Sequence, residues 1–186
     1  EPSRRWVSMD FFAPGEVSAL INLAKAQSFR KAQNEVAHRT IRVFQDFDVC
    51  FPCPRTGLFD QLAESLEDGL FAAGAALQEN PFQTRFCLDD FAIQRYPVGS
   101  RGIGIHRDGN RYKHIVVIVT LAGCSRLFST ATRTGKNLQR IDDRPGRLVL
   151  LSADGFAGRD GEDARPFHGV DRVAAGRLSI GFRSTG

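Results

Sequence analysis

A histidine and an aspartate two positions apart are among the most informative residues of this chain, because both types can bind a metal ion. They are His106 and Asp108, in the segment Ile105–Gly109. Residues i and i+2 of an extended strand point to the same face, so one short segment can present an imidazole nitrogen and a carboxylate oxygen to one ion. Because an H-x-D pattern arises often by chance, further residues must complete the site.

His168 is a third candidate ligand, 60 positions after Asp108. Two histidines and one carboxylate form the facial triad that suits non-haem Fe(II) and leaves three coordination positions open. Zinc can use the same three ligands, so the residue types alone do not choose the metal. Nine residues after His168, Arg177 opens an apolar run that ends at Arg183. As a strand, this run would offer a fixed guanidinium fork to a carboxylate.

The order of these features resembles the Fe(II)/2-oxoglutarate-dependent dioxygenase superfamily. An H-x-D motif is followed by a long β-rich interval, a histidine, and an Arg-x-Ser on a terminal apolar strand. Within that superfamily the motifs most resemble the AlkB-like branch. That branch has an Asn-x-Tyr element where this chain has Gln94-Arg95-Tyr96. It closes with an Arg-x-Asn-x-Thr-x-Arg strand, and residues 177–183 occupy that place here. Ser179 replaces the second Asn and Gly181 the Thr. The match covers roughly residues 90 to 183, and its specific part is the ligand and arginine positions.

The resemblance implies a role for each matching residue. His106, Asp108 and His168 would bind Fe(II) and form the catalytic centre, and Arg177 would pair with the distal carboxylate of the 2-oxoglutarate cosubstrate. Dioxygen would be the second cosubstrate. The other residues implied to contact 2-oxoglutarate are Tyr96, Gln94, Ser179 and Arg183, the last near its keto-acid end.

Composition places the chain among soluble globular proteins. With 186 residues, 42% of them hydrophobic and 25% charged, we expect a single domain over residues 1–186. No run approaches the ~20 apolar residues of a membrane span. Residues 1–6 lack the apolar core of a signal peptide. We therefore expect a cytoplasmic protein with no membrane partner, whose oligomeric state this sequence does not predict.

Charge and cysteine usage add two expectations. The net charge of +4 is modest, but arginines cluster around residues 101–113 and 126–147, near the H-x-D motif. A positive mouth would favour an anionic substrate, and the alternative is a solvated surface. Cys50 and Cys53 form a C-x-x-C, which in other settings binds zinc or does redox chemistry. No second pair completes a zinc site, so we expect reduced, packed thiols.

The remaining pattern predicts two helices followed by eight or so strands. Residues 14–28 and 57–78 have helical apolar stripes, with Pro14 in the first turn of one, Thr56 as N-cap of the other, and Asn80-Pro81 ending it. The predicted strands are Thr40 to Val49, Thr84 to Tyr96, His114 to Leu121, Arg126 to Thr130, Arg147 to Ser152 and Arg177 to Phe182. This pattern favours an α+β fold. The resemblance makes its core a double-stranded β-helix, or jelly roll, braced by the two N-terminal helices, with the metal between the sheets near one open end.

Two glycine-containing stretches and two further histidines lie outside the motifs described above. Residues 99–109 carry four glycines, which would permit a tight loop around the ligands. Residues 154–163 form either a mobile flap over the site or an ordinary surface excursion. His114 is a rival ligand that we expect to be structural, because it opens an apolar strand. His38 has no evident partner in the sequence.

The sequence leaves two classes of substrate open. The resemblance implies hydroxylation, or a related oxidation, of a C–H bond with release of succinate and CO2. A small-molecule metabolite is favoured because the chain is compact. The alternative is AlkB-like oxidative demethylation of alkylated nucleobases in DNA or RNA, which the arginines and the pI near 9.1 favour. Against that alternative, the chain has only one Trp and two Tyr, so few side chains of the kind that usually stack on nucleobases, although 15 Phe are present. A non-enzymatic binding module is disfavoured because the three ligands and the arginine are all present.

Overall fold

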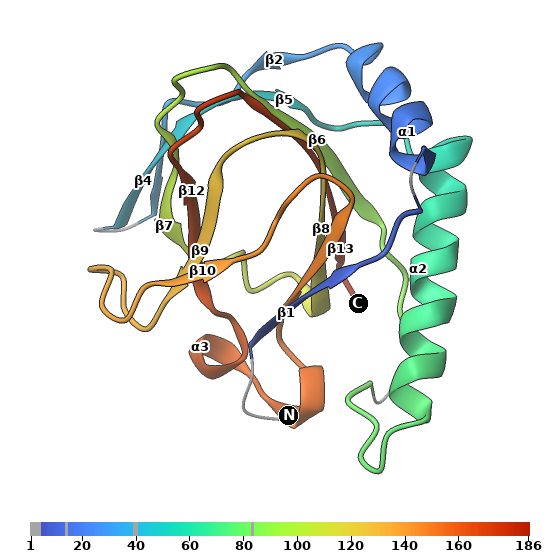
Figure 1. The fold of residues 1–186 in the computed structure, drawn as a ribbon. Helices are drawn as coiled ribbons and strands as arrows, with labels where there is room; N and C mark the ends of the chain where they lie inside the picture. The colour runs from blue at the N-terminus through green and yellow to red at the C-terminus, as the bar shows by residue number, and fades with distance from the viewer. Residues whose placement is uncertain (1–4, 14, 39–40, 83) are drawn as a thin grey trace.

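Two antiparallel sheets face each other in the computed structural model, which describes residues 5–13, 15–38, 41–82 and 84–186. One sheet has the order β1-β11-β8-β13-β6-β5-β2 and the other β10-β9-β12-β7-β4-β3 (Figure 1). The strands described are β1 (Trp6–Asp10), β2 (Arg30–Lys31), β3 (Glu35–His38), β4 (Ile41–Asp46), β5 (Asp48–Cys50), β6 (Asp90–Tyr96), β7 (Gly102–His106), β8 (Lys113–Gly123), β9 (Arg126–Thr130), β10 (Gln139–Ile141), β11 (Arg147–Ser152), β12 (Phe167–Asp171) and β13 (Arg177–Ser184).

Strands β6 to β13 form the jelly roll. Along the chain they alternate between the sheets, except that β9 and β10 are neighbours in the same one. The quartets β11-β8-β13-β6 and β10-β9-β12-β7 therefore lie opposite each other. This arrangement leaves the inner faces of both quartets to form a shared interior, and the predicted antiparallel double-sheet core is confirmed.

Two apolar clusters hold these layers together. The first joins α1 (Glu16–Lys25) and α2 (Leu58–Ala75) to the seven-stranded sheet, with Leu20, Phe59 and Leu66 packed beside Ile180 and Phe182 of β13. Figure 1 shows both helices along one flank of the barrel. Their burial contributes to stability roughly in proportion to the apolar area removed from water.

The second cluster fills the space between the sheets. Ile103, Leu127, Ile141 and Val170 of the six-stranded sheet belong to it, as does Val116 of β8. Ile103, Leu127 and Val170 also line a small cavity of this interior together with polar residues of the same inner faces. No helix in the described residues is long and apolar enough to cross a membrane.

Both helices are shorter than predicted. The helix expected at 14–28 spans Glu16–Lys25, and Pro14 lies outside the described residues. The helix expected at 57–78 spans Leu58–Ala75 and ends before Asn80-Pro81. Thr56 is not its N-cap: Gly57 occupies that position, and no side chain caps the helix. Strands also precede and separate the helices, so the predicted order of two helices followed by strands is wrong.

The strand predictions differ from the structure in three ways. The strand expected from Thr40 to Val49 is two strands in different sheets, β4 and β5, and Thr40 itself lies outside the described residues. The strand expected from Thr84 begins only at Asp90. Four short strands were not predicted: β1, β2, β3 and β10. Their segments are too short or too rich in glycine and charge to show an apolar period.

Strand β7 is the most consequential of the short strands. It lies in the glycine-rich stretch expected to be a loop, and it pairs with β12 so that His106 is opposite His168. Gly102 starts it with φ 83°, and a Cβ there would lie 1.8 Å from the carbonyl oxygen of Val170. Only glycine allows this approach, which accompanies a shift of register between His168 and Val170.

Candidate metal and cosubstrate site

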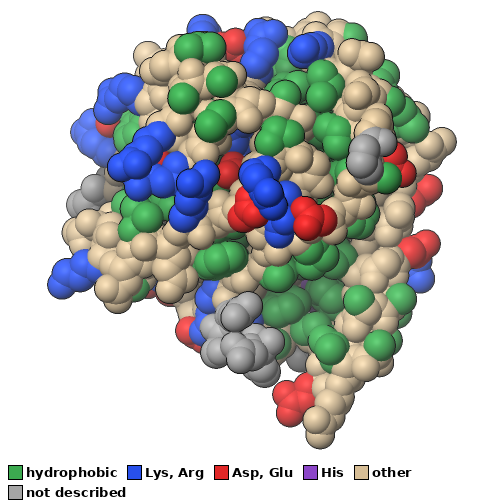
Figure 2. Space-filling view, in the orientation of Figure 1, with side chains coloured by type: hydrophobic (Ala, Val, Ile, Leu, Met, Phe, Trp, Pro, Cys, Tyr) green, Lys and Arg blue, Asp and Glu red, His purple; other side chains and the backbone are tan. Residues whose placement is uncertain are grey.

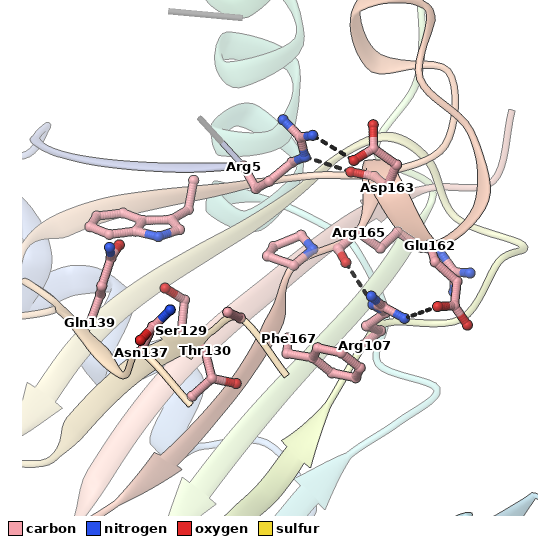
Figure 3. Close-up of a pocket in the computed structure, with 13 residues that line it drawn as sticks. Arg5, Arg107, Ser129, Thr130, Asn137, Gln139, Glu162, Asp163, Arg165 and Phe167 are labelled. Atoms are coloured by element: carbon pink, nitrogen blue, oxygen red, sulfur yellow. Dashed lines mark hydrogen bonds and ion pairs between the residues drawn. The ribbon is translucent and has the colours of Figure 1, made fainter. Parts of the chain in front are cut away.

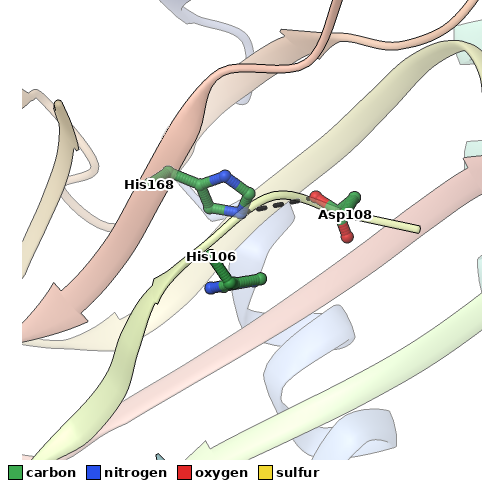
Figure 4. A group of neighbouring side chains, drawn as sticks. All are labelled: His106, Asp108 and His168. Atoms are coloured by element: carbon green, nitrogen blue, oxygen red, sulfur yellow. Dashed lines mark ion pairs between the residues drawn. The ribbon is translucent and has the colours of Figure 1, made fainter. Parts of the chain in front are cut away.

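His106, Asp108 and His168 converge on one point, as predicted from their types. Each offers a ligating atom, and these atoms lie within 4.8 Å of one another (Figure 4). His106 ends β7, Asp108 follows two residues later outside the strand, and His168 is the second residue of β12. The Nε2 of His168 is 3.3 Å from Oδ2 of Asp108. Asp108 therefore reaches the site from the segment that follows β7 rather than from a strand face.

Backbone carbonyls orient both imidazoles. The Nδ1 of His106 is 2.8 Å from the Gly104 oxygen, and the Nδ1 of His168 is 3.1 Å from the Pro166 oxygen. A carbonyl can only accept, so in the neutral rings Nδ1 carries the proton and Nε2 carries a free lone pair. Metal-ligating histidines are commonly oriented in this way. The donor set therefore fits a divalent ion such as Fe(II) or zinc.

The protonation states also suit metal binding. Burial lowers the pKa of His106 to about 4, so the ring is neutral at pH 7. Burial alone would raise the pKa of Asp108, but the Arg183 charge and the two imidazoles outweigh it and lower that pKa to about 2. Asp108 is therefore ionised. Ligands that are already deprotonated release no proton when the metal binds.

Arg183 bridges two carboxylates at this end of the interior. Its Nε donates to Asp108 Oδ1 at 3.2 Å, and its Nη1 is 3.6 Å from Asp90 Oδ1. Gly181, which departs from the AlkB-like pattern, explains how the guanidinium reaches that far. A Cβ at position 181 would lie 3.3 Å from Arg183 Nη1, tighter than most real contacts. The missing side chain leaves room for Arg183 to lie over it.

Arg177 occupies the deep end of the same interior and is 3% exposed. Its Nη2 donates to Thr120 Oγ1 at 2.9 Å, its Nη1 donates to the Ser179 hydroxyl, and its Nε donates to Asp143 Oδ2 at 3.3 Å. A guanidinium has five N–H donors, so one on each terminal nitrogen stays available for a ligand carboxylate. Arg177 and Ser179 are two positions apart on β13 and therefore share one face, which brings their side chains into hydrogen-bonding contact.

Tyr96 and Gln94 lie between the two ends. They face Arg177 and Ser179 across the β6–β13 pairing, and the Tyr96 hydroxyl donates to Gln94 Oε1 at 3.2 Å. Burial raises the pKa of Tyr96 to about 12, so it remains a neutral donor. A cavity of about 30 Å³ runs along this interior, and its lining includes Gln94, Tyr96, Arg177, Arg183 and the three metal-ligand candidates. Its small volume means that side chains must move apart to admit a five-carbon diacid.

A second cavity, of about 520 Å³, opens over the outer side of the ligands. His106 and Asp108 line it together with Arg107, Arg133 and Arg165, and with apolar side chains of β3 and β4. Figure 2 shows that basic side chains gather on the part of the surface away from the helices. Arg107 pairs with Glu162 and Arg165 with Asp154. The expected positive mouth is therefore only partly compensated by acids.

The structure settles the position of several other residues. His114 is apart from the metal ligands and packs against Phe86, with ring centroids 5.7 Å apart. Cys50 and Cys53 are buried free thiols, and burial raises the pKa of Cys53 to about 12, as a packed and unreactive thiol requires. The segment 154–163 contains a 3-10 turn (Phe156–Gly158) and most of the short helix α3 (Gly161–Ala164), so it is more ordered than a plain loop. His38 has its backbone in β3, and its side chain lies outside the described part.

Sequence reasoning missed two residues at the deep end. Asp143 is 5% exposed and follows β10 in the turn to β11, while Thr120 lies in the middle of β8. Neither has a motif around it. In the sequence, Asp143 lies between Asp142 and Arg144, and this short charged run indicates an ordinary polar turn. Only the folded chain shows that the Asp143 side chain is buried against Arg177.

Comparison with known proteins identifies the fold. No protein-family model matches the chain. No curated protein matches it either. Among solved structures, a prolyl-4-hydroxylase from Pseudomonas putida is 18% identical, with TM-score 0.65 over 97% of this chain and 92% of that one. A 2OG-Fe(II) oxygenase family oxidoreductase from Burkholderia pseudomallei is 14% identical, with TM-score 0.64 over 98% and 85%.

OsALKBH1 is similar to the same degree, 13% identical with TM-score 0.63 over 96% of each chain. Prolyl hydroxylase and AlkB-type names thus appear at nearly equal similarity, and the fold does not separate them. At these identities the likeness concerns the fold alone. The chain has the double-sheet fold of solved 2-oxoglutarate and Fe(II) oxygenases, as its motif order implied.

Proposed function

We propose that this protein is a 2-oxoglutarate-dependent Fe(II) oxygenase that hydroxylates, or otherwise oxidises, a C–H bond of a small-molecule metabolite, with release of succinate and CO2. One observation carries the proposal. The metal-ligand candidates His106, Asp108 and His168 lie at one end of an interior cavity whose other end holds the buried Arg177. A keto diacid needs both features at once: a metal for its keto-acid end and a cation for its distal carboxylate.

The residues of the chain divide the work between them. His106, Asp108 and His168 would hold Fe(II) on one side and leave its other side open. The free N–H groups of Arg177 would take the distal carboxylate, with the neutral Tyr96 hydroxyl as a further donor. When bound, the iron, 2-oxoglutarate and O2 supply the oxidising chemistry, and the protein contributes placement.

The mouth of the site favours a substrate with an anionic group. Arg133 lines the outer cavity, its guanidinium lies 5.1 Å from the centre of the Phe167 ring, and within the described residues it has no acidic partner. Its single hydrogen bond there is to the Ile105 oxygen at 3.4 Å. An unpaired arginine beside the metal ligands would attract and orient a carboxylate or phosphate.

Nucleobase demethylation is the second candidate. The six-residue spacing of Arg177 and Arg183 and the likeness to OsALKBH1 favour it. Base recognition usually needs exposed aromatic rings for stacking. Tyr96 and Tyr112 are 2% and 8% exposed, so neither tyrosine is available for stacking at the surface. Binding to single-stranded DNA that weakens steeply with salt would favour this candidate over the first.

Anaerobic titration tests the proposed activity directly. The purified apoprotein is titrated with Fe(II) and then with 2-oxoglutarate, while the weak visible charge-transfer band of the chelated keto acid is followed. We expect a band that requires both additions and is absent in His168→Ala. Tight zinc binding with no band would instead identify a hydrolytic or structural zinc site.

A further inference from the structure

A row of polar side chains continues from the metal-ligand candidates across the inner face of the six-stranded sheet. His106 is opposite His168, His168 is opposite Ser129, and Ser129 is opposite Gln139. Directly opposed residues of adjacent strands share a face. Strands lie about 4.8 Å apart, so Ser129 is one strand and Gln139 two strands beyond His168.

The neighbouring row fixes which face this is. Ile141, Leu127 and Val170 stand two positions along the same strands, in register with one another, and belong to the cluster between the sheets. Residues two apart on a strand point to the same side. Ser129 and Gln139 therefore point to the interior side of the sheet, where the histidines lie.

A cavity of about 680 Å³ lies beside this row, between the terminal strands β1 and β10 (Figure 3). We call it the edge pocket, and its lining includes Trp6, Ser129, Asn137, Gln139, Arg107 and Glu162. At one end the two strands are joined, because the Ser8 hydroxyl donates to the Asp142 oxygen. Trp6 of β1 and Gln139 of β10 both line the pocket. Arg107 and Glu162 also line the cavity over the metal ligands, so the two cavities adjoin.

The edge pocket contains polar groups without partners. Ser129 is 6% exposed, and its hydroxyl has no hydrogen-bond partner in the part of the chain that the structure describes. Asn137 and Gln139 are exposed, and their side-chain amides likewise have no partner among the described residues. These groups line the pocket with open hydrogen-bonding positions, which a ligand with matching donors and acceptors would occupy.

Two of the three arginines that line the edge pocket pair with acids that also line it, and the third, Arg165, pairs with Asp154. Arg107 Nη1 is 2.8 Å from Glu162 Oε2, and Arg5 Nη2 is 2.7 Å from Asp163 Oδ1. An anionic or cationic ligand group would have to break one of these pairs. Two amides that both donate and accept, a hydroxyl and a flat indole suit an uncharged planar group instead. β1 and β10 are each the last strand of their sheet, so each also presents backbone N–H and C=O groups on one edge.

We propose that the edge pocket is a substrate subsite for an uncharged amide group, such as a peptide unit, whose attached carbon is oxidised at the adjoining metal ligands. The inference rests on the proposed function for the chemistry, but the subsite itself rests on the register and the unpartnered polar groups. An amide offers a planar face to Trp6, an oxygen to Ser129 and Asn137, and an N–H to Gln139. Backbone edges recognise the same donor and acceptor pattern, which favours an amide over a nucleobase.

Saturation-transfer NMR with N-acetylglycinamide as the probe tests the subsite without needing metal or turnover. We expect transfer from the wild-type protein and an affinity about threefold to tenfold weaker in Ser129→Ala and in Gln139→Leu, since each loses one neutral hydrogen bond. Gln78→Leu, which changes an exposed glutamine after α2, is the matched control and should bind like wild type. N-acetylglycine, of the same size but charged, should bind more weakly.

Loading the protein with Mn(II) adds a distance readout. We expect Mn(II) to enhance the relaxation of the bound probe in wild type and not in Asp108→Ala, while saturation transfer persists in both. Failure of Mn(II) to bind would count against the proposed function and leave the subsite result intact. Equal probe binding by wild type, Ser129→Ala and Gln139→Leu would overturn the subsite. Preferential binding of cytidine through these residues would overturn its amide chemistry.

Discussion

The two ends of β13 carry the same ion pair in two different settings. Arg183 donates to Asp108 at 3.2 Å and Arg177 to Asp143 at 3.3 Å, each through Nε. Asp108 also adjoins two imidazoles and can hold a metal, whereas the other side-chain partner of Asp143 is the Ser125 hydroxyl at 3.4 Å. Under the proposed function, the pair at one end would serve a cation, and the pair at the other end would admit a second carboxylate.

This difference shows what each aspartate is for. At the metal end the carboxylate is the functional group, and Arg183 keeps it ionised. Under the proposed function, the arginine would be the functional group at the deep end, and Asp143 would balance its buried charge until a diacid binds. Leaving a buried charge without a partner is strongly destabilising. The predictions below test this assignment.

Replacing the metal-end carboxylate should have the largest effect. Asp108→Asn removes the anionic ligand. Loss of a residue that only supports a metal ligand lowers metal affinity by at most ~100-fold, so we expect Fe(II) affinity to fall by more than that. Metal binding is followed by anaerobic calorimetry. Asp90→Asn is the matched control, because Asp90 also contacts Arg183 but is no ligand. Equal losses in both variants would mean that Arg183 rather than the ligand set controls the site.

Replacing the deep arginine should act on the cosubstrate. In Arg177→Ala, loss of charge-assisted hydrogen bonds of about 1.5–3 kcal/mol each should raise the apparent KM for 2-oxoglutarate by ~10-fold or more. Fe(II) affinity should stay near that of wild type. An unchanged KM would remove Arg177 from this role, whatever happens to stability.

Removing the charge of Asp143 should make folding depend on the cosubstrate. Asp143→Asn keeps the shape but leaves the buried Arg177 uncompensated, so the melting temperature of the apoprotein should fall. 2-Oxoglutarate supplies the missing carboxylate, and its stabilising shift should exceed that of wild type in a thermal-shift assay. Asp142→Asn, at a partly exposed neighbour paired with Arg144, is the control. Equal ligand-induced shifts in the three proteins would show that Asp143 and the diacid do not share Arg177.

Mild acid should destabilise the metal-free protein through His106. The unfolded chain binds a proton at this residue below about pH 6.5 and the folded chain only below about 4. The contribution to stability is therefore complete above pH 6.5 and is lost as pH falls from 6.5 to 4. Below that, Asp108 adds a further loss as pH falls from 3.8 through about 2. Urea unfolding at several pH values should show a shallower slope for His106→Gln between pH 6.5 and 4.

The smallest expected effect concerns Gly181. In Gly181→Ala the new Cβ would crowd Arg183 Nη1, and we expect Fe(II) affinity to weaken by only a few-fold because the guanidinium is flexible. Gly69→Ala lies in α2 with no atom near its Cβ and should be neutral or slightly stabilising. Full retention of affinity in Gly181→Ala would indicate that Arg183 can reach Asp108 by another path.

The sequence by itself determined the residues of the metal end and the arginines of β13. Residue type and spacing can be read from the sequence directly. They are what made four residues informative: His106, Asp108, His168 and Arg177. Long apolar strands such as β8 were also predictable, since burial on both faces leaves a continuous hydrophobic run. Helix ends were predicted less well, because glycine rather than a capping side chain precedes each helix.

Only the tertiary structure decided what pairs with these residues. Asp143, Ser129 and Gln139 have no motif, and they gain meaning from a strand register set by pairing between distant segments. The role of Gly102 in β7 was hidden for a similar reason, because its close approach to Val170 depends on pairing with a distant strand. Local pattern records which side chains can do chemistry, while non-local packing fixes which of them meet.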